Sequence, residues 1–152
     1  MWKLLGADPA AIANDDEQPS ILRVATYVRA CTRPEDRLFV LGEHPLLYYF
    51  SDRLFAGGHA WLLPLYYTGD QDEMRIVTRL ESVRVPIVLT ESRPVYDEDY
   101  RPVFEQLHQY LERGYREAGE VEIDGSRRLR VLVRAGLQPV RHYDPLDLPC
   151  FK

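Results

Sequence analysis

Leu38-Phe39-Val40-Leu41-Gly42 and Pro86-Ile87-Val88-Leu89-Thr90 decide the fold. Each is a short apolar run that ends at a glycine or a polar residue, which is typical of a strand buried on both faces. Apolar residues at helical spacing precede each run, over 21–31 and 73–84. Two successive helix-then-strand units predict an α/β fold whose mixed, mostly parallel sheet is flanked by helices.

The helix before the second strand has a recognisable beginning. Asp70 and Glu73 have the spacing of a capping box, in which an acidic N-cap is followed three residues later by glutamate. Pro86 ends the pattern, because proline cannot continue a helix. The residues expected to face the core are Met74, Val77, Leu80 and Val83.

The last third of the chain predicts a helix and a hairpin. The helix has Pro102 in its first turn and Gly114 at its C-terminal cap. Its apolar stripe is Val103, Phe104, Leu107, Tyr110 and Leu111. Asp124-Gly125-Ser126 then separates two alternating segments, which is a strong hairpin signal and places an antiparallel pair at the sheet edge. We expect one small domain over 20–136, between a lead-in segment at 1–19 and an irregular tail over 137–152.

Composition excludes several classes of protein. The chain has 152 residues, of which 45% are hydrophobic and 28% charged, as in an ordinary globular domain. Its net charge of −5 disfavours nucleic acid as a partner. No apolar run approaches the roughly 20 residues of a membrane span, so we expect this chain to be soluble.

Cysteine and histidine give weak signals. Cys31 and Cys150 either form one bridge that closes nearly the whole chain or remain free, and the pattern favours two free thiols. The four histidines lack the spacing of a metal site, and no phosphate-binding or catalytic motif is present. The sequence therefore predicts no metal, no cofactor and no catalytic residue.

Polar residues follow both predicted strands. Glu43 and His44 come after the first strand, and Glu91 and Arg93 after the second. Ligands of open α/β sheets bind beyond the carboxyl ends of strands, so these side chains predict either a small polar pocket, with His44 as acid or base, or an ion-paired rim. The ion-paired rim is the favoured interpretation. The candidate ligand-binding residues are Glu43, His44, Tyr48, Glu91, Arg93 and Tyr96.

Two further patterns have a functional and a structural interpretation. Aromatic residues gather between Tyr48 and Tyr67, where a carbohydrate platform or membrane-interface belt would place them, although packing of a small core is favoured. Arginines line the predicted hairpin over 127–134. They either face anionic lipid or, as we favour, keep an edge strand solvated.

Residues 27–42 read YVRACTRPEDRLFVLG, and residues 45–53 read PLLYYFSDR. This arrangement resembles the soluble C-terminal region of GT-C type membrane glycosyltransferases, the group that includes protein mannosyltransferase-like and aminoarabinose transferase-like bacterial enzymes. The helix over 73–84 and its following strand fit the same region, so the resemblance covers about residues 8 to 135. Leu54-Phe55 departs from it, because the family tends to have Arg-Pro there.

The resemblance implies a domain that does not catalyse a reaction by itself. Members of the family use polyprenyl-phosphate-linked sugars, and their membrane helices and catalytic loop have no counterpart here. The resemblance implies an accessory domain on the extracytoplasmic (periplasmic) face of the membrane, non-catalytic in isolation. Its partners would be the transmembrane region of a parent protein and a sugar or polyprenyl-phosphate-sugar. The alternatives are a free-standing small α/β enzyme or nucleotide-binding domain that uses the polar rim, and a protein-interaction module.

Overall fold

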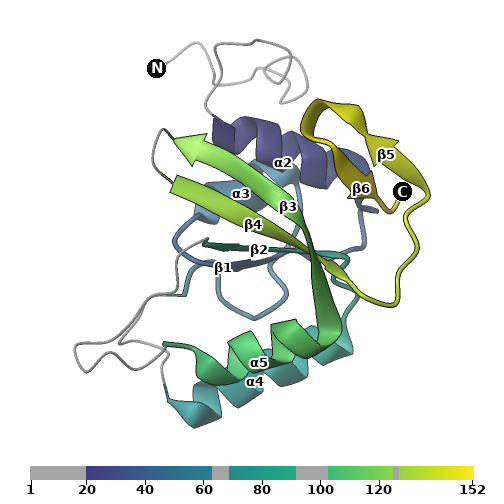
Figure 1. Cartoon of the computed structure of the whole chain (residues 1–152). Helices are drawn as coiled ribbons and strands as arrows, with labels where there is room; N and C mark the ends of the chain where they lie inside the picture. The colour runs from purple at the N-terminus through teal and green to yellow at the C-terminus, as the bar shows by residue number, and fades with distance from the viewer. Residues whose placement is uncertain (1–19, 63–68, 92–102, 125–126) are drawn as a thin grey trace.

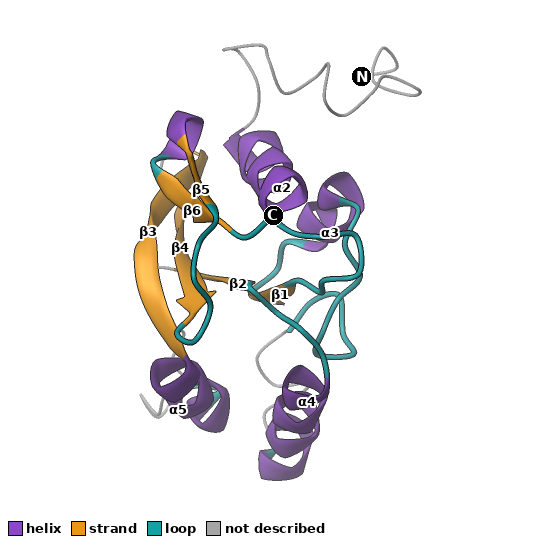
Figure 2. Cartoon of the chain, turned by 90° about the vertical axis from the view of Figure 1, so that its right-hand side faces the viewer, coloured by secondary structure: helices purple, strands orange, loops and turns teal. Residues whose placement is uncertain are grey.

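The computed structural model describes residues 20–62, 69–91, 103–124 and 127–152. A four-stranded sheet lies between two layers of helices (Figures 1 and 2). In chain order the elements are α2 (Ser20–Cys31), β1 (Phe39–Leu41), α3 (Pro45–Ser51), α4 (Asp70–Ser82), β2 (Ile87–Glu91), α5 (Glu105–Gly114), β3 (Tyr115–Asp124), β4 (Arg127–Arg134), β5 (Arg141–Tyr143), the 3-10 turn η2 (Asp144–Leu146) and β6 (Leu148–Cys150). The predicted lead-in segment at 1–19 lies outside the described residues.

The sheet has the strand order β1-β2-β4-β3. β1 runs parallel to β2, with Phe39 opposite Val88, and β4 pairs antiparallel with both β2 and β3. The predicted α/β class is confirmed, as are the parallel pair and the hairpin at the sheet edge. The expectation of a mostly parallel sheet is not met, because the hairpin contributes two antiparallel pairs to one parallel pair.

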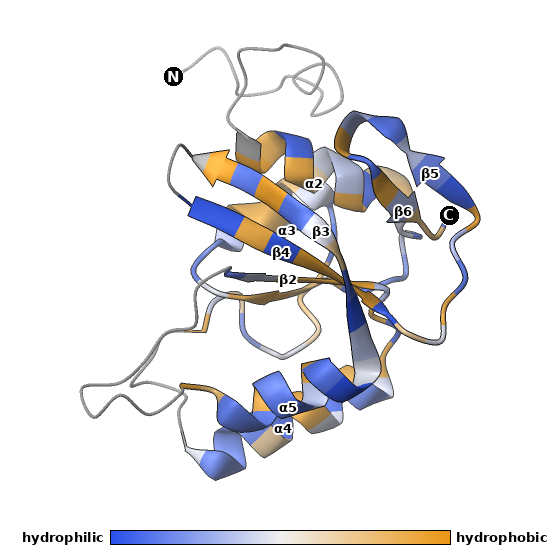
Figure 3. Cartoon of the chain, in the orientation of Figure 1, coloured by the Kyte–Doolittle hydropathy of each residue, from blue (hydrophilic) through white to orange (hydrophobic). Residues whose placement is uncertain are grey.

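Both faces of the sheet are buried. Val40, Leu89 and Val131 pack in one core with α2 and α3, whereas Val88 and Leu132 pack in a second core with α4 and α5. Successive residues of a strand point to opposite faces, so a continuous apolar run supplies both cores at once. Figure 3 shows that hydrophobic and hydrophilic residues alternate along β3 and β4.

The predicted capping box of α4 is wrong. Gly69 is the N-cap, and the helix buries Glu73, Ile76 and Leu80. Met74, which was expected to face the core, is 52% exposed. Glu73 instead accepts a hydrogen bond of 3.0 Å from the backbone N–H of Leu107, in the first turn of α5. The carboxylate thus caps a neighbouring helix, where backbone donors are free and the helix dipole favours negative charge.

The boundaries of α5 and β3 also differ from expectation. α5 begins at Glu105, after Phe104 in the left-handed region (φ 61°). Gly114 is its last residue, and Tyr115 starts β3 without a connecting loop. β3 is therefore ten residues long, whereas the alternating pattern predicted only its last part.

The tail predicted as irregular over 137–152 is largely ordered. β5 and β6 pair antiparallel, and Leu148, Cys150 and Phe151 are buried. Cys31 and Cys150 form a disulfide across 119 residues of sequence, so the prediction of free thiols is wrong. The reason is that β6 returns to the end of α2, where the Tyr27 hydroxyl donates to the Pro149 carbonyl at 2.8 Å.

Among the described residues, no helix is long and apolar enough to cross a membrane.

Removing the disulfide should destabilise the fold. Replacing both Cys31 and Cys150 with alanine frees a loop that spans most of the chain, and we expect the free energy of unfolding to fall by about 2–5 kcal/mol. Urea denaturation with and without reductant measures this change. The double variant should be insensitive to reductant, and an unchanged urea midpoint would contradict the structural role of the bridge.

Glu73 should make stability depend on pH. Burial raises the pKa of its carboxyl, against the opposing effect of backbone hydrogen bonds from Leu107 and Gln106. The raised folded-state pKa means that its contribution is full below the unfolded pKa of about 4.3 and is lost as pH rises through the folded-state value. Compared with Glu73→Gln, the wild type should therefore lose relative stability as pH rises. Urea denaturation of both proteins across acidic to neutral pH tests this, and a relative gain would show that the helix dipole outweighs desolvation.

Candidate functional site

Two of the predicted rim residues, His44 and Glu91, meet at the carboxyl ends of β1 and β2. These strands are parallel neighbours, so Gly42 and His44 follow β1 at the same edge at which Glu91 ends β2. The His44 Nε2 atom lies 2.5 Å from the Glu91 Oε1 atom. The sequence correctly predicted that these two residues lie together, and their contact is a hydrogen bond between the imidazole and the carboxylate.

Burial determines what this pair can do. His44 is only 4% exposed, whereas the Glu91 side chain is 26% exposed. The imidazole therefore orients the carboxylate, and the carboxylate is the member that reaches solvent. Gly42 permits the approach, because a Cβ atom there would lie 3.2 Å from the Glu91 Cγ. The arrangement holds a carboxylate ready to accept a hydrogen bond from a ligand hydroxyl or amine.

The other candidate residues divide into three groups. Glu43 precedes His44 in the chain and is exposed. Tyr48 was expected at the rim but is buried in the core under α3, where its hydroxyl accepts a hydrogen bond of 2.9 Å from the Val40 N–H. Burial raises its pKa strongly. Arg93 and Tyr96 lie outside the described residues.

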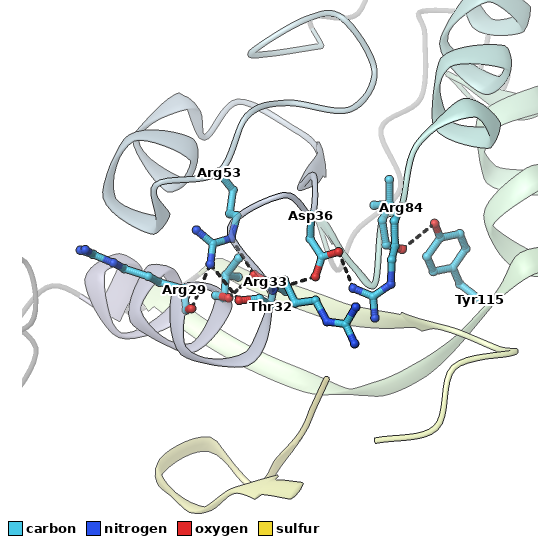
Figure 4. A network of polar contacts seen from close by, with 9 residues as sticks. Arg29, Thr32, Arg33, Asp36, Arg53, Arg84 and Tyr115 are labelled. Carbon is cyan, nitrogen blue, oxygen red and sulfur yellow. Dashed lines mark hydrogen bonds and ion pairs between the residues drawn. The ribbon is translucent and has the colours of Figure 1, made fainter. Parts of the chain in front are cut away.

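Arg53 forms the most extensive polar network in the described part of the chain (Figure 4). Its Nη2 atom donates to the carbonyls of Arg29 (3.1 Å) and Thr32 (2.8 Å), and its Nε atom donates to the Thr32 hydroxyl at 2.8 Å. The Nη1 atom donates to the Asp52 carbonyl at 2.7 Å. Arg53 is 5% exposed, so this guanidinium caps the C-terminal end of α2 from inside the protein.

Asp36 anchors the loop between α2 and β1. Its Oδ2 atom accepts a hydrogen bond of 2.7 Å from the Arg33 N–H, and its Oδ1 atom pairs with the Arg84 guanidinium. The side chain of Asp36 is fully buried, and these two partners satisfy its two oxygen atoms. Arg84 also accepts a backbone hydrogen bond from the Arg37 N–H at 2.9 Å, which ties the approaches to β1 and β2 together.

Thr32, Asp36 and Arg53 belong to the stretch that carries the glycosyltransferase resemblance. Sequence reasoning assigned them no individual role. Arg53 follows an apolar helix in a segment with few carboxylates, and this is the signal that could have marked it as a buried arginine. The backbone carbonyls that it binds cannot be identified from the sequence. In the structure Arg53 joins the end of α3 to the end of α2, and Asp36 joins the loop before β1 to Arg84, which precedes β2.

A groove of about 520 Å³ lies between α2, β3 and η2, and sequence reasoning missed it. Its lining residues are Arg23, Val24, Glu120, Val121, Glu122, Asp144, Pro145, Leu146 and Asp147. Glu120 lies 3.9 Å from Arg128, and Asp147 lies 2.7 Å from His142. The charged lining residues are exposed, so water solvates them.

Metal ligation is not supported in the described ranges, where no three His, Cys, Asp or Glu side chains cluster. The groups that a ligand can meet here are the carboxylates of Glu43 and Glu91, and the His44 imidazole orients the Glu91 carboxylate.

Comparison with known proteins finds no matching family model, no similar curated protein and no similar solved structure.

Replacing Arg53 should strongly destabilise the domain. Arg53→Met preserves most of the side-chain volume but leaves buried carbonyls at the end of α2 without donors, and we expect a loss of about 3 kcal/mol. The matched control is Arg29→Met on the exposed side of the same helix end, which should change stability by less than about 0.5 kcal/mol. Urea denaturation compares the two, and equal effects would refute the capping role.

Proposed function

We propose that this chain is an accessory, extracytoplasmic domain of a polyprenyl-phosphate-sugar-dependent membrane glycosyltransferase, which positions acceptor or donor and performs no chemistry in isolation. The observation that carries the proposal is the Arg53 network. Thr32, Asp36 and Arg53 stand in the stretch that resembles this family, and they make buried contacts between separate elements. Because these residues make buried structural contacts, their resemblance to the family favours a shared fold over a chance similarity of surface residues.

The disulfide supports the extracytoplasmic location. Cys31 and Cys150 are both fully buried and join the end of α2 to the last strand. Structural disulfides are typical of oxidising compartments such as the periplasm and are rare in the cytosol. We therefore infer that the domain folds on the extracytoplasmic side, beside the transmembrane region of a parent protein.

The His44–Glu91 pair supports a positioning role. The imidazole is buried against the carboxylate, so it fixes the direction of Glu91 and is poorly placed to exchange protons with a ligand. Glu91 and the exposed Glu43 can accept hydrogen bonds from neighbouring sugar hydroxyls. A site with one exposed and one partly buried carboxylate covers little ligand surface, so the affinity should be weak, near 1 mM or about −4 kcal/mol.

An NMR titration of the full chain tests this proposal. Simple sugars and a polyprenyl-phosphate-sugar analogue should shift the backbone amides of Gly42, Glu43 and Glu91. Glu91→Ala should abolish these shifts, whereas Glu105→Ala, an exposed carboxylate at the start of α5, should leave them unchanged.

Other outcomes would favour the alternatives. Turnover of a donor by the purified chain, lost on His44→Ala, would support a free-standing enzyme. An absence of shifts at tens of millimolar sugar would remove the sugar-positioning role and favour a protein-interaction module.

A further inference from the structure

Exposed apolar side chains concentrate on α3 and the segment that follows it. Tyr49 is 79% exposed and Leu54 62%. We use the name α3 surface for Leu46, Tyr49, Leu54, Phe55 and Trp61, which are five of the large hydrophobic residues exposed in the described part of the chain. Exposed apolar residues that occur singly need no explanation, but a contiguous group marks a contact surface.

Two observations place these residues together. In α3, Leu47, Tyr48 and Ser51 are buried, so Leu46 and Tyr49 share the opposite, outward stripe. The following segment starts and ends beside α3 and passes α4 in between, where Arg79 donates to the Gly57 carbonyl at 3.2 Å. It begins with a hydrogen bond of 3.2 Å from the Arg53 N–H to the Tyr48 carbonyl and ends with one of 3.5 Å from the Leu62 N–H to the Gly42 carbonyl.

Phe55 shows how closely this returning segment packs against the helix. Its ring makes an edge contact with the Tyr48 ring, with 5.9 Å between the centroids.

Basic side chains gather next to the α3 surface, at the C-terminal end of α2. Arg141 donates to the Ala30 carbonyl at 2.9 Å and to the Lys152 carbonyl at 3.1 Å. Arg53, which follows α3, donates to the Arg29 carbonyl. Figure 2 shows this end of α2, the C-terminal residues and α3 on one side of the molecule. We use the name basic cluster for Arg29, Arg33, Arg141 and Lys152, all exposed.

The charge of this region is opposite to that of the whole chain. α2 contains no acidic residue, and the exposed carboxylates whose charges act on the neighbouring Arg53 are Asp52 and Glu35. The four cations outnumber these two carboxylates, whereas the chain as a whole carries −5. A positive region beside an apolar surface complements an anionic lipid bilayer.

We propose that the α3 surface and the basic cluster together rest on an anionic phospholipid membrane. Tyr49 and Trp61 carry the amphipathic rings that favour the membrane–water interface, and Leu46, Leu54 and Phe55 add apolar area that can enter it. The basic cluster contacts the lipid phosphates. This inference goes beyond the proposed function, because it needs no sugar ligand and fixes which side of the domain faces the bilayer.

Sedimentation with lipid vesicles tests the proposal on the full chain. The wild type should bind vesicles that contain phosphatidylglycerol and should bind pure phosphatidylcholine vesicles much more weakly. The double variant Tyr49→Ser/Leu54→Ser should lose binding to both. Its matched control is Met74→Ser on α4, which removes an apolar side chain of similar exposure (52%) outside the α3 surface and should bind like the wild type.

A second pair of variants tests the electrostatic part. Arg29→Gln/Arg33→Gln should weaken binding to anionic vesicles about 25-fold, the equivalent of about 1 kcal/mol for each cation. Arg113→Gln/Arg116→Gln removes two exposed cations elsewhere, on α5 and β3, and should have a smaller effect. In a Trp2→Phe background, brominated lipid should quench the fluorescence of Trp61.

Three results would overturn the proposal. The first is no binding of the wild type to anionic vesicles. The second is binding that the α3 variant does not weaken. The third is self-association without lipid that Tyr49→Ser/Leu54→Ser abolishes, which would make the surface an interface between copies of the chain. Failure of the sugar titration would not affect these outcomes, so the two proposals can be judged separately.

Discussion

The end of α2 has to be satisfied inside the protein, and the rest of the structure is arranged around that requirement. The last carbonyls of a helix have no partner within it. Here Val28 accepts from the Thr32 N–H, Arg29 from Arg53, Ala30 from Arg141 and Cys31 from the Phe151 N–H. Three of these four donors come from segments distant in sequence. The helix end is therefore a junction at which the segment after α3, strand β5 and the residue after β6 meet.

This junction explains why the C-terminal residues belong to the core. β6 brings Cys150 to Cys31 and places Phe151 and Leu148 among buried side chains. The disulfide and the hydrogen bonds both join the end of α2 to the C-terminal residues. Each therefore keeps these two segments in the positions that the other requires. A helix end buried without such partners would leave several carbonyls desolvated, at a cost of about 1–3 kcal/mol each.

The sequence revealed those parts of the fold that depend on local patterns. Leu38–Leu41 and Ile87–Leu89 were recognisable as strands buried on both faces, because nearly every position in them is apolar. Their parallel pairing then followed from the helices between them, and it correctly predicted that His44 and Glu91 meet. These inferences needed no knowledge of a distant partner.

The remaining features depend on contacts across the chain. Glu73 has the spacing of a cap for its own helix, yet its carboxylate binds Leu107 because α4 and α5 pack together. The Cys31–Cys150 bond required knowing that the tail returns to α2. Residue types and spacing contain neither fact, because both arise only when separate elements are packed.

The run Leu46–Phe50 shows the same limit within a single short helix. Five consecutive apolar residues give no periodicity, so the sequence could not distinguish the buried side from the exposed side. The structure turns Tyr48 inward, where its hydroxyl satisfies the Val40 N–H on the outer edge of β1, and this rotation necessarily turns Leu46 and Tyr49 outward. The contact that protects the edge of the sheet therefore also creates the apolar surface on α3. The exposure of that surface follows from how the sheet edge is closed, and the bilayer that we propose is an environment in which these apolar side chains can leave water.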